Sequence, residues 1–211
     1  MKQQLILVGG GGHCQSVIDI IETAGKYEII GILDQAHKVG QSVSGYPVVG
    51  TDDELASWIR LEICFLITVG QTNQHQTRFA LFQKIQRAGG KWATAISPRA
   101  YVSPSATLGA GTTIMHDALV NTRARVGENT IINTQALVEH GASVGSHCHV
   151  ATGAIVNGDC RVGDHVLIGS GAVLLQGTTI AKSAIIGAGA VVTRSLTEPG
   201  TYTGVPARKI R

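Results

Sequence analysis

The chain has 211 residues, which is enough for one large domain or two small ones. Its net charge of +3 is modest and its lysines and arginines form no cluster, so the sequence does not indicate a nucleic-acid partner. No apolar stretch is long enough to span a bilayer, and the apolar run at residues 5–8 is too short for a secretory signal. We therefore expect a cytoplasmic protein without a membrane partner, whose four cysteines are reduced thiols.

The first hundred residues alternate short apolar runs with helical patterns. Three aliphatic runs predict buried strands: residues 5–8, 29–34 and 64–69. Apolar side chains at helical spacing predict helices around residues 17–21 and 79–85, and Thr51 followed by Glu54 predicts the start of another helix. Strands that alternate with helices in this way are typical of a Rossmann-like, doubly wound α/β domain, which we place at residues 1–96.

A run of glycines follows the first predicted strand. Gly10, Gly11 and Gly12 lie where the next helix begins, and backbone N–H groups at a helix N-terminus favour an anion such as a phosphate. Asp34 ends the second predicted strand, where a carboxylate can bind a ribose hydroxyl. The run departs from the dinucleotide pattern G-x-G-x-x-G, because a cysteine or glutamine replaces the third glycine. A nucleotide site and a tight structural turn are both open here.

A six-residue repeat fills the rest of the chain. From Val102 to Val192 an aliphatic residue recurs at every sixth position, and a small or β-branched residue follows four positions after each of the first fifteen. This period predicts a parallel β-helix, in which the aliphatic side chains form an inner column. We place this domain, with a C-terminal tail, at residues 97–211. Glycine often follows the aliphatic residue, as at Gly109, Gly127, Gly145, Gly163, Gly169 and Gly187. We expect these glycines to accept the backbone angles of the corners.

Histidines are the candidates for chemistry in the repeat. His140 falls at a corner of the predicted β-helix, outside the column, where a side chain can reach a ligand or a neighbouring molecule. Histidine is the usual base for proton transfer near neutral pH. Taken alone, a corner histidine is more often a solvated surface residue. His147 and His149 can share a face, but two histidines do not make a closed zinc site, so we expect no metal.

Both halves together resemble the bacterial sugar acetyltransferases that join a Rossmann-like domain to a left-handed β-helix. This family includes the bacillosamine and perosamine N-acetyltransferases and the sialic acid O-acetyltransferases. The resemblance covers essentially the whole chain. Its markers are Gly9-Gly10-Gly11-Gly12-His13, Gly31-Ile32-Leu33-Asp34, Asn133-Thr134, Val138-Glu139-His140, His149 and Gly204-Val205-Pro206-Ala207.

The resemblance implies an enzyme that uses acetyl-CoA, with His140 as the general base. It also implies that Asn133 lies near the sugar, that His149 lies near the acetyl group, and that the N–H of Gly158 binds the thioester carbonyl. In this family an acidic residue often follows the base and orients its ring. Gly141 stands there in this chain, so the partner of His140 is open.

The same resemblance assigns His13, Asp34 and the glycine turn to a nucleotide-sugar pocket, and it implies a homotrimer. Arg208 and Lys209 are candidates to bind the phosphates of CoA, with a solvated basic tail as the alternative. We expect acetylation of the amino group of a nucleotide-activated 4-amino-6-deoxy sugar for surface glycan biosynthesis. The alternatives are O-acetylation of a sialic-acid-type sugar and a non-catalytic scaffold that binds sugar nucleotides, because a fold does not by itself imply a function.

Overall fold

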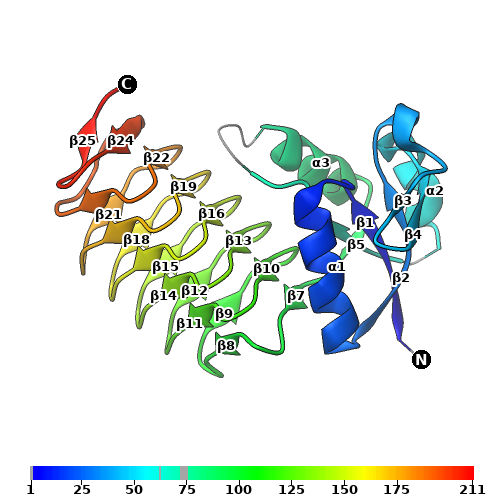
Figure 1. Ribbon diagram of the computed structural model, residues 1–211, viewed down its shortest axis with the longest axis horizontal. Helices are drawn as coiled ribbons and strands as arrows, with labels where there is room; N and C mark the ends of the chain where they lie inside the picture. Colours follow the sequence, from blue (N-terminus) through cyan, green and yellow to red (C-terminus); the bar gives the residue numbers. More distant parts are fainter. Residues whose placement is uncertain (1, 62, 72–75) are drawn as a thin grey trace. The chain divides into compact units, whose positions relative to one another are not determined.

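The computed structural model describes residues 2–61, 63–71 and 76–211. By its internal contacts the chain divides into two compact units, Met1–Ile96 and Ser97–Arg211. Both are drawn in Figure 1. Among the described helices, none is long and apolar enough to cross a lipid bilayer.

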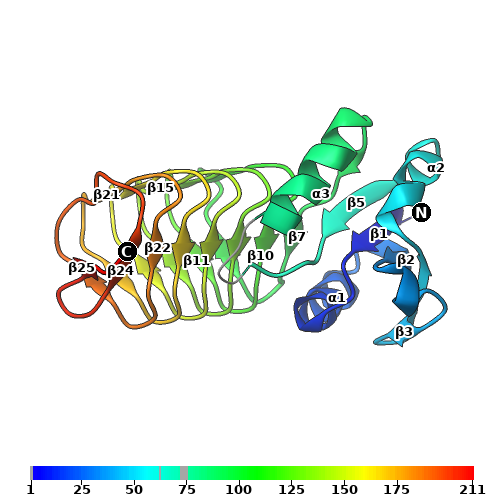
Figure 2. The ribbon, with the colours of Figure 1, turned by 90° about the horizontal axis from the view of Figure 1, so that it is seen from above.

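The first unit is built on a six-stranded sheet with the order β3-β4-β2-β1-β5-β6, in which β3 is the one antiparallel strand. Its strands are β1 (Gln3–Val8), β2 (Tyr27–Leu33), β3 (Ser42–Val43), β4 (Tyr46–Gly50), β5 (Cys64–Ile67) and β6 (Lys91–Trp92), and β7 (Ala95–Ile96) ends the unit. Its helices are α1 (Gly12–Ala24), α2 (Leu55–Ile59) and α3 (Gln76–Arg87), with 3-10 turns η1 (Ala36–Lys38) and η2 (Asp52–Glu54). Figure 2 shows α1 and α3 on opposite faces of the sheet.

The predicted α/β domain is confirmed, with the three predicted strands present as β1, β2 and β5. The sequence analysis missed the hairpin of β3 and β4. The sequence signal for this hairpin is the dipeptide Ser44-Gly45, which forms its two-residue turn. Both residues have positive φ (48° and 87°), as such a tight turn requires. This hairpin places β4 beside β2 at one end of the sheet.

The second unit is a parallel β-helix with three sheets of two-residue strands. The first β-helix sheet contains β10 (Thr113–Ile114), β13 (Ile131–Ile132), β16 (His149–Val150), β19 (Leu167–Ile168) and β22 (Ile185–Ile186), followed by β24 (Thr201–Thr203) and β25 (Arg208–Lys209). The second contains β8 (Tyr101–Val102), β11 (Leu119–Val120), β14 (Leu137–Val138), β17 (Ile155–Val156), β20 (Val173–Leu174) and β23 (Val191–Val192). The third contains β9 (Thr107–Leu108), β12 (Arg125–Val126), β15 (Ser143–Val144), β18 (Arg161–Val162) and β21 (Thr179–Ile180).

The apolar column predicted from the repeat is confirmed. Each of the predicted aliphatic residues is the second residue of a strand, and those from Ile114 to Val192 are buried. From β8 to β20, each strand pairs in parallel with the third strand after it in the chain, so Val138 lies between Val120 and Val156. One coil therefore consists of three repeats, and equivalent corner residues are stacked one coil apart.

The role predicted for the glycines after the aliphatic residues is wrong. None of these glycines has positive φ. A Cβ atom built on Gly127 would lie 2.5 Å from the backbone nitrogen of Ser146 and 2.6 Å from the carbonyl carbon of Gly145. Glycine is required there because the next coil approaches closely. The left-handed backbone angle comes two positions later and recurs at every sixth position from Gly111 to Gly189, including at non-glycine residues such as Asp159.

Candidate active site

His140 stands on the corner that follows β14, and its side chain is exposed. Its backbone N–H donates to Glu139 Oε2 at 3.1 Å, and its carbonyl accepts the N–H of Asp159, one coil later, at 3.0 Å. The Glu139 carboxylate also accepts from Asn121 Nδ2 at 2.7 Å, so it holds the corner. Within the described part of the chain, the ring nitrogens of His140 make no hydrogen bond, which leaves them available to a ligand.

Gly158 occupies the equivalent corner position one coil later, against the His140 ring. A Cβ atom on Gly158 would lie 2.6 Å from Cε1 and 2.7 Å from Nε2 of His140, so a larger residue would displace the ring. No group among residues 2–61, 63–71 and 76–211 accepts a hydrogen bond from the Gly158 N–H. The neighbouring Asn157 side chain donates instead to the carbonyl of Leu174 at 2.7 Å. An N–H donor beside a histidine is an arrangement that can stabilise an oxyanion.

The carboxylate of Asp159 lies against Gly141. Gly141 has a left-handed φ of 68°, and a Cβ atom on it would contact Asp159 Oδ1 and lie 3.4 Å from Asp159 Cγ. Gly141 therefore makes room for a carboxylate from the next coil. The sequence analysis missed Asp159, which the coil length of three repeats places directly over Gly141.

Asn133, on the corner after β13, and His149, the first residue of β16, form a hydrogen-bonded pair. Asn133 Oδ1 accepts the N–H of Thr134 at 2.8 Å, and Asn133 Nδ2 lies 3.0 Å from His149 Nε2. Because Oδ1 is the acceptor in the first contact, Nδ2 is the donor in the second, and His149 Nε2 accepts.

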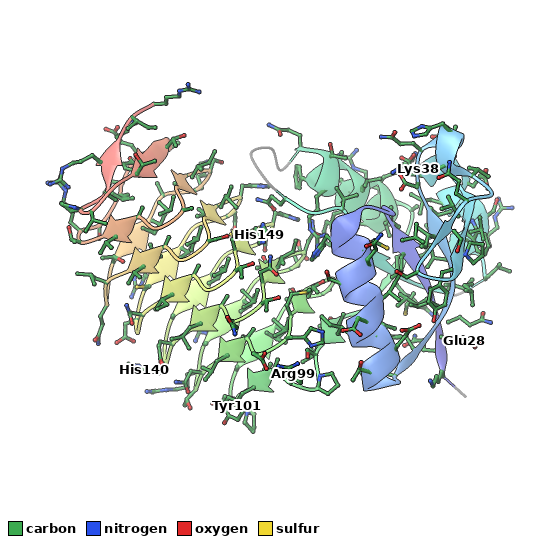
Figure 3. All side chains as sticks on the ribbon, viewed as in Figure 1. Glu28, Lys38, Arg99, Tyr101, His140 and His149 are labelled. Carbon is green, nitrogen blue, oxygen red and sulfur yellow. The ribbon has the colours of Figure 1, made fainter. Side chains whose placement is uncertain are left out.

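The predicted site residues of the β-helix fall into two groups. Figure 3 shows His140 and His149 at different places on the β-helix, because His140 follows β14 and His149 begins β16 in another sheet. One chain brings His140 to Gly158, and it brings Asn133 to His149. It does not bring the two pairs together.

Asp34 fixes the glycine turn between β1 and α1. Its Oδ2 accepts the N–H of Gly10 at 2.7 Å and Lys38 Nζ at 2.9 Å, and its Oδ1 accepts the N–H of Gln35 at 2.7 Å. Burial alone would raise the pKa of the Asp34 carboxyl, but Lys38 and the two backbone donors outweigh it and lower that pKa. The N–H of Gly10 is therefore already bound to Asp34. The sequence analysis missed Lys38, although its place four residues after Asp34 was a signal.

Gly11 and Gly12 lie at the start of α1 with open space around them. A Cβ atom on either glycine would meet no atom within 4 Å, so packing inside the chain does not require glycine there. Open backbone at a helix N-terminus permits the close approach of an anion. His13 is half-buried in the same turn, with its Cβ 3.5 Å from the Cβ position of Gly70.

A pocket of about 260 Å³ adjoins Asp34. Apolar and polar side chains share its wall, which includes Val8, Leu33, Val69, Leu81, Asp34, Gln35, Asp52 and Thr77. Apolar walls with a few polar groups are typical of pockets that bind small molecules. The pocket therefore fits the sugar-nucleotide role predicted for Asp34, and that role stays a prediction.

We expect the substitution Asp34→Asn to remove part of the acid sensitivity of the fold. The pKa of Asp34 is lowered in the folded chain, so its ionised form stabilises the fold above the ordinary aspartate pKa of about 3.9. This stabilisation is lost as the pH falls through the lower folded value. Urea midpoints measured at pH 5 and pH 3 should therefore fall further in the unsubstituted protein than in the variant. Equal losses would contradict the role given to this carboxylate.

A second pocket, of about 390 Å³, lies at the carboxyl end of the β-helix and is lined by Arg194, Arg208 and Lys209, among others. Lys209 Nζ is paired with Glu198 Oε2 at 2.8 Å, and Arg208 Nη1 donates to the carbonyl of Ala207 at 2.9 Å. The proposed contact of Arg208 and Lys209 with CoA phosphates stays a prediction. Arg194 is a basic residue of this pocket that the sequence analysis did not name.

His147, His165 and the cysteines are engaged in packing. His147 stacks on His165, with ring centroids 5.0 Å apart, and its Nδ1 lies 3.0 Å from Asn129 Nδ2. Burial raises the pKa of Cys148 to about 12 and that of Cys14 to about 11, so both stay protonated at neutral pH. Among the described residues, no three His, Cys, Asp or Glu side chains are grouped to hold a metal ion.

Comparisons with known proteins match both units. Residues 4–85 match the PglD N-terminal domain family, and residues 159–194 match the bacterial transferase hexapeptide family (six repeats). The acetyltransferase domain of PglB from Neisseria gonorrhoeae FA1090 is 31% identical, with a TM-score of 0.92 over 99% of this chain and 100% of that chain. It has also been solved in complex with acetyl coenzyme A, with the same identity and TM-score over 100% of both chains.

Two further relatives extend the comparison. PerB from Caulobacter crescentus, solved in complex with CoA and GDP-perosamine, is 32% identical, with a TM-score of 0.91 over 99% of this chain and 97% of that chain. The uncharacterized protein L142 of Acanthamoeba polyphaga mimivirus is 33% identical over 108 residues, which are 51% of this chain. The chain matches 20% of the length of that curated relative.

Proposed function

Because this chain belongs to the hexapeptide-repeat sugar acetyltransferases of the left-handed β-helix fold, we propose that it transfers the acetyl group of acetyl-CoA to the amino group of a nucleotide-activated 4-amino-6-deoxy sugar. The ligands of the relatives support this choice, since the PglB domain binds acetyl coenzyme A and PerB binds CoA and GDP-perosamine. Within this chain the proposal rests on one observation, the contact of the His140 imidazole with Gly158.

The proposed step is a direct transfer. The sugar amine attacks the thioester carbonyl carbon, a C–N bond forms, and the carbonyl electron pair moves to oxygen. The Gly158 N–H stabilises that oxyanion, and His140 takes the proton from the attacking nitrogen. When the tetrahedral intermediate collapses, the C–S bond breaks and the CoA sulfur receives the proton from His140. The products are the N-acetyl sugar and free CoA.

We propose that the enzyme is a homotrimer in which neighbouring chains share each site. Outward side chains of the second β-helix sheet are apolar or aromatic throughout: Tyr101, Leu119, Leu137, Ile155, Val173 and Val191. Those of the third sheet are polar: Thr107, Arg125, Ser143, Arg161 and Thr179. A contiguous apolar face favours contact with another copy. A second chain also allows the His140 pair and the His149 pair to meet at one acetyl group. Light scattering should give the mass of three chains, and a monomer would contradict this assembly.

O-acetylation of a sugar is the runner-up, and it uses the same donor and the same base. The GDP-perosamine bound by PerB, whose name marks an amino sugar, favours the amine. A non-catalytic scaffold that binds sugar nucleotides is the alternative from another class. It gives no reason for a histidine and an available N–H donor to lie against each other at His140 and Gly158.

The test is an acceptor screen with acetyl-CoA. UDP-, GDP- and dTDP-linked 4-amino-6-deoxy sugars should each be compared with the matching 4-hydroxy sugar, and free CoA thiol should be followed with a thiol reagent. The four protein cysteines are buried, so their background reaction should be slow. Mass spectrometry should find one added acetyl group that resists mild base, as an amide does. A base-labile product would favour the O-acetyl ester, and failure to bind acetyl-CoA in calorimetry would favour the scaffold.

A further inference from the structure

A histidine that acts as a base works best beside a group that stabilises its protonated form. Glu139, the carboxylate next in sequence to His140, is bound to Asn121 and to the His140 backbone N–H. We propose that Asp159, from the next coil, is the positioning residue that stabilises the protonated His140 imidazole. This inference rests on the proposed role of His140 as the base.

The side chains of His140 and Asp159 cross, because they point in opposite directions between the same two coils. The His140 ring leans toward the next coil and lies against Gly158, where a Cβ atom would be 2.7 Å from its Nε2. The Asp159 carboxylate leans back and lies against Gly141, where a Cβ atom would contact its Oδ1. Each side chain fits because the residue it covers is glycine. The crossing therefore explains Gly141 and Gly158 together, and it sets a carboxylate one corner position away from the imidazole.

The backbone keeps this crossing in register. The Asp159 N–H donates to the His140 carbonyl at 3.0 Å, so the two residues cannot slide apart along the β-helix. Asp159 has φ of 59°, a left-handed angle that aspartate tolerates better than most residues do. Its side chain is exposed, so it can turn toward the ring without disturbing the apolar column.

The charges around His140 favour this role for Asp159. Glu139 and Asp159 carry negative charge at this corner, and Arg123 occupies the left-handed position one coil earlier. The Glu139 carboxylate is held at the corner by two hydrogen bonds to its Oε2, whereas the Asp159 carboxylate accepts none from the described residues and so can respond to the ring. A nearby negative charge favours the imidazolium that forms when His140 takes the proton of the amine.

The first experiment is Asp159→Asn, which keeps the size and the left-handed preference of the residue and removes its charge. We expect kcat to fall by about tenfold or more and KM for acetyl-CoA to change little. The acid limb of the kcat/KM profile should move to lower pH, because the imidazolium loses its charge partner. The matched control is Asp117→Asn, since Asp117 has the same left-handed turn position (φ of 57°) on a different corner. Its pH profile should match that of the unsubstituted enzyme.

The second experiment moves the carboxylate from position 159 to position 141, on the neighbouring coil. Asp159→Ala should lose activity as Asp159→Asn does, and Gly141→Asp alone should also lose activity because its Cβ would meet the Asp159 carboxylate. The double variant Gly141→Asp/Asp159→Ala removes that overlap and restores a carboxylate at the same corner. We expect it to recover much of kcat and the original pH profile. Circular dichroism should show that all three variants keep the β-helix.

The outcomes separate this inference from the proposed function. If His140→Ala abolishes turnover while Asp159→Asn leaves kcat and the pH profile unchanged, Asp159 has no such role and the base assignment stands. If His140→Ala keeps near-normal turnover, the base assignment fails first. If Asp159→Asn lowers kcat equally in the presence and absence of His140, Asp159 acts independently of the ring and the inference is overturned.

Discussion

Replacement of His140 by alanine should lower kcat for acetyl transfer by about 10²- to 10⁴-fold, the usual contribution of a positioned general base. The imidazole is the group that takes the proton of the attacking amine in the proposed step. The side chain is exposed and supports no other described side chain, so the free energy of unfolding should change by about 0.5 kcal/mol or less. Release of CoA thiol at saturating acetyl-CoA and acceptor measures kcat, and urea unfolding measures the stability.

Another exposed histidine provides the control for this prediction. His37 is an exposed residue of the first unit, in η1, and His37→Ala should leave both kcat and the unfolding midpoint unchanged. Affinity for acetyl-CoA, measured by calorimetry, should also survive the loss of His140, because the proposed donor contact is the Gly158 N–H. Near-normal turnover in His140→Ala would show that the base lies elsewhere.

Gly158→Ala should be almost as damaging to turnover, for a steric reason. The added methyl group would lie 2.6 Å from His140 Cε1, so the imidazole has to swing away. A displacement of about 1 Å in a catalytic group can cost about 10²-fold in rate. Because the displaced atoms are the far end of an exposed side chain, the fold should lose little stability. The expected signature is therefore a large fall in kcat with a nearly unchanged unfolding midpoint.

The matched control is a glycine whose neighbour cannot move. A Cβ atom on Gly127 would meet backbone atoms of Gly145 and Ser146 at 2.5–2.6 Å, and these atoms are held by the stacking of the coils. Gly127→Ala should therefore cost about 1–3 kcal/mol of stability, the usual range for overpacking, while kcat of the remaining folded enzyme stays normal. If both alanine variants behaved alike, the movable His140 ring and the fixed backbone of the next coil would not differ in how they accept a methyl group.

The β-helix could be predicted because its sequence signal is local and repeated. An aliphatic residue at every sixth position fixes the period of the column, and the structure places each one at the end of a two-residue strand. The role of Gly127 could not be read in the same way, because its constraint comes from atoms of Gly145 and Ser146, one coil away. A local pattern shows that glycine recurs, but the close approach appears only after the coils are stacked.

In the candidate site, too, one part could be predicted from the local repeat and another part could not. The corner position of His140 follows from the repeat register, while its contact with Gly158 and the crossing of Asp159 over Gly141 depend on stacking. A ligand role for Asp34 does not point to Lys38, because Lys38 binds Asp34 together with the glycine turn that Asp34 holds. Contacts between side chains of successive coils or of neighbouring strands cannot be predicted from the linear sequence.

The coil length has a consequence for how such a chain can change its size. Strand partners are three repeats apart, as Val138 and Val156 are, so each coil contains three equal repeats. An insertion of one repeat between Gly141 and Gly158 would preserve the apolar column and yet move Gly158 to a different edge from His140. An insertion of three repeats elsewhere would leave every edge aligned. Insertions and deletions in this enzyme should therefore be tolerated when they comprise whole coils of three repeats, and not when they comprise a single repeat.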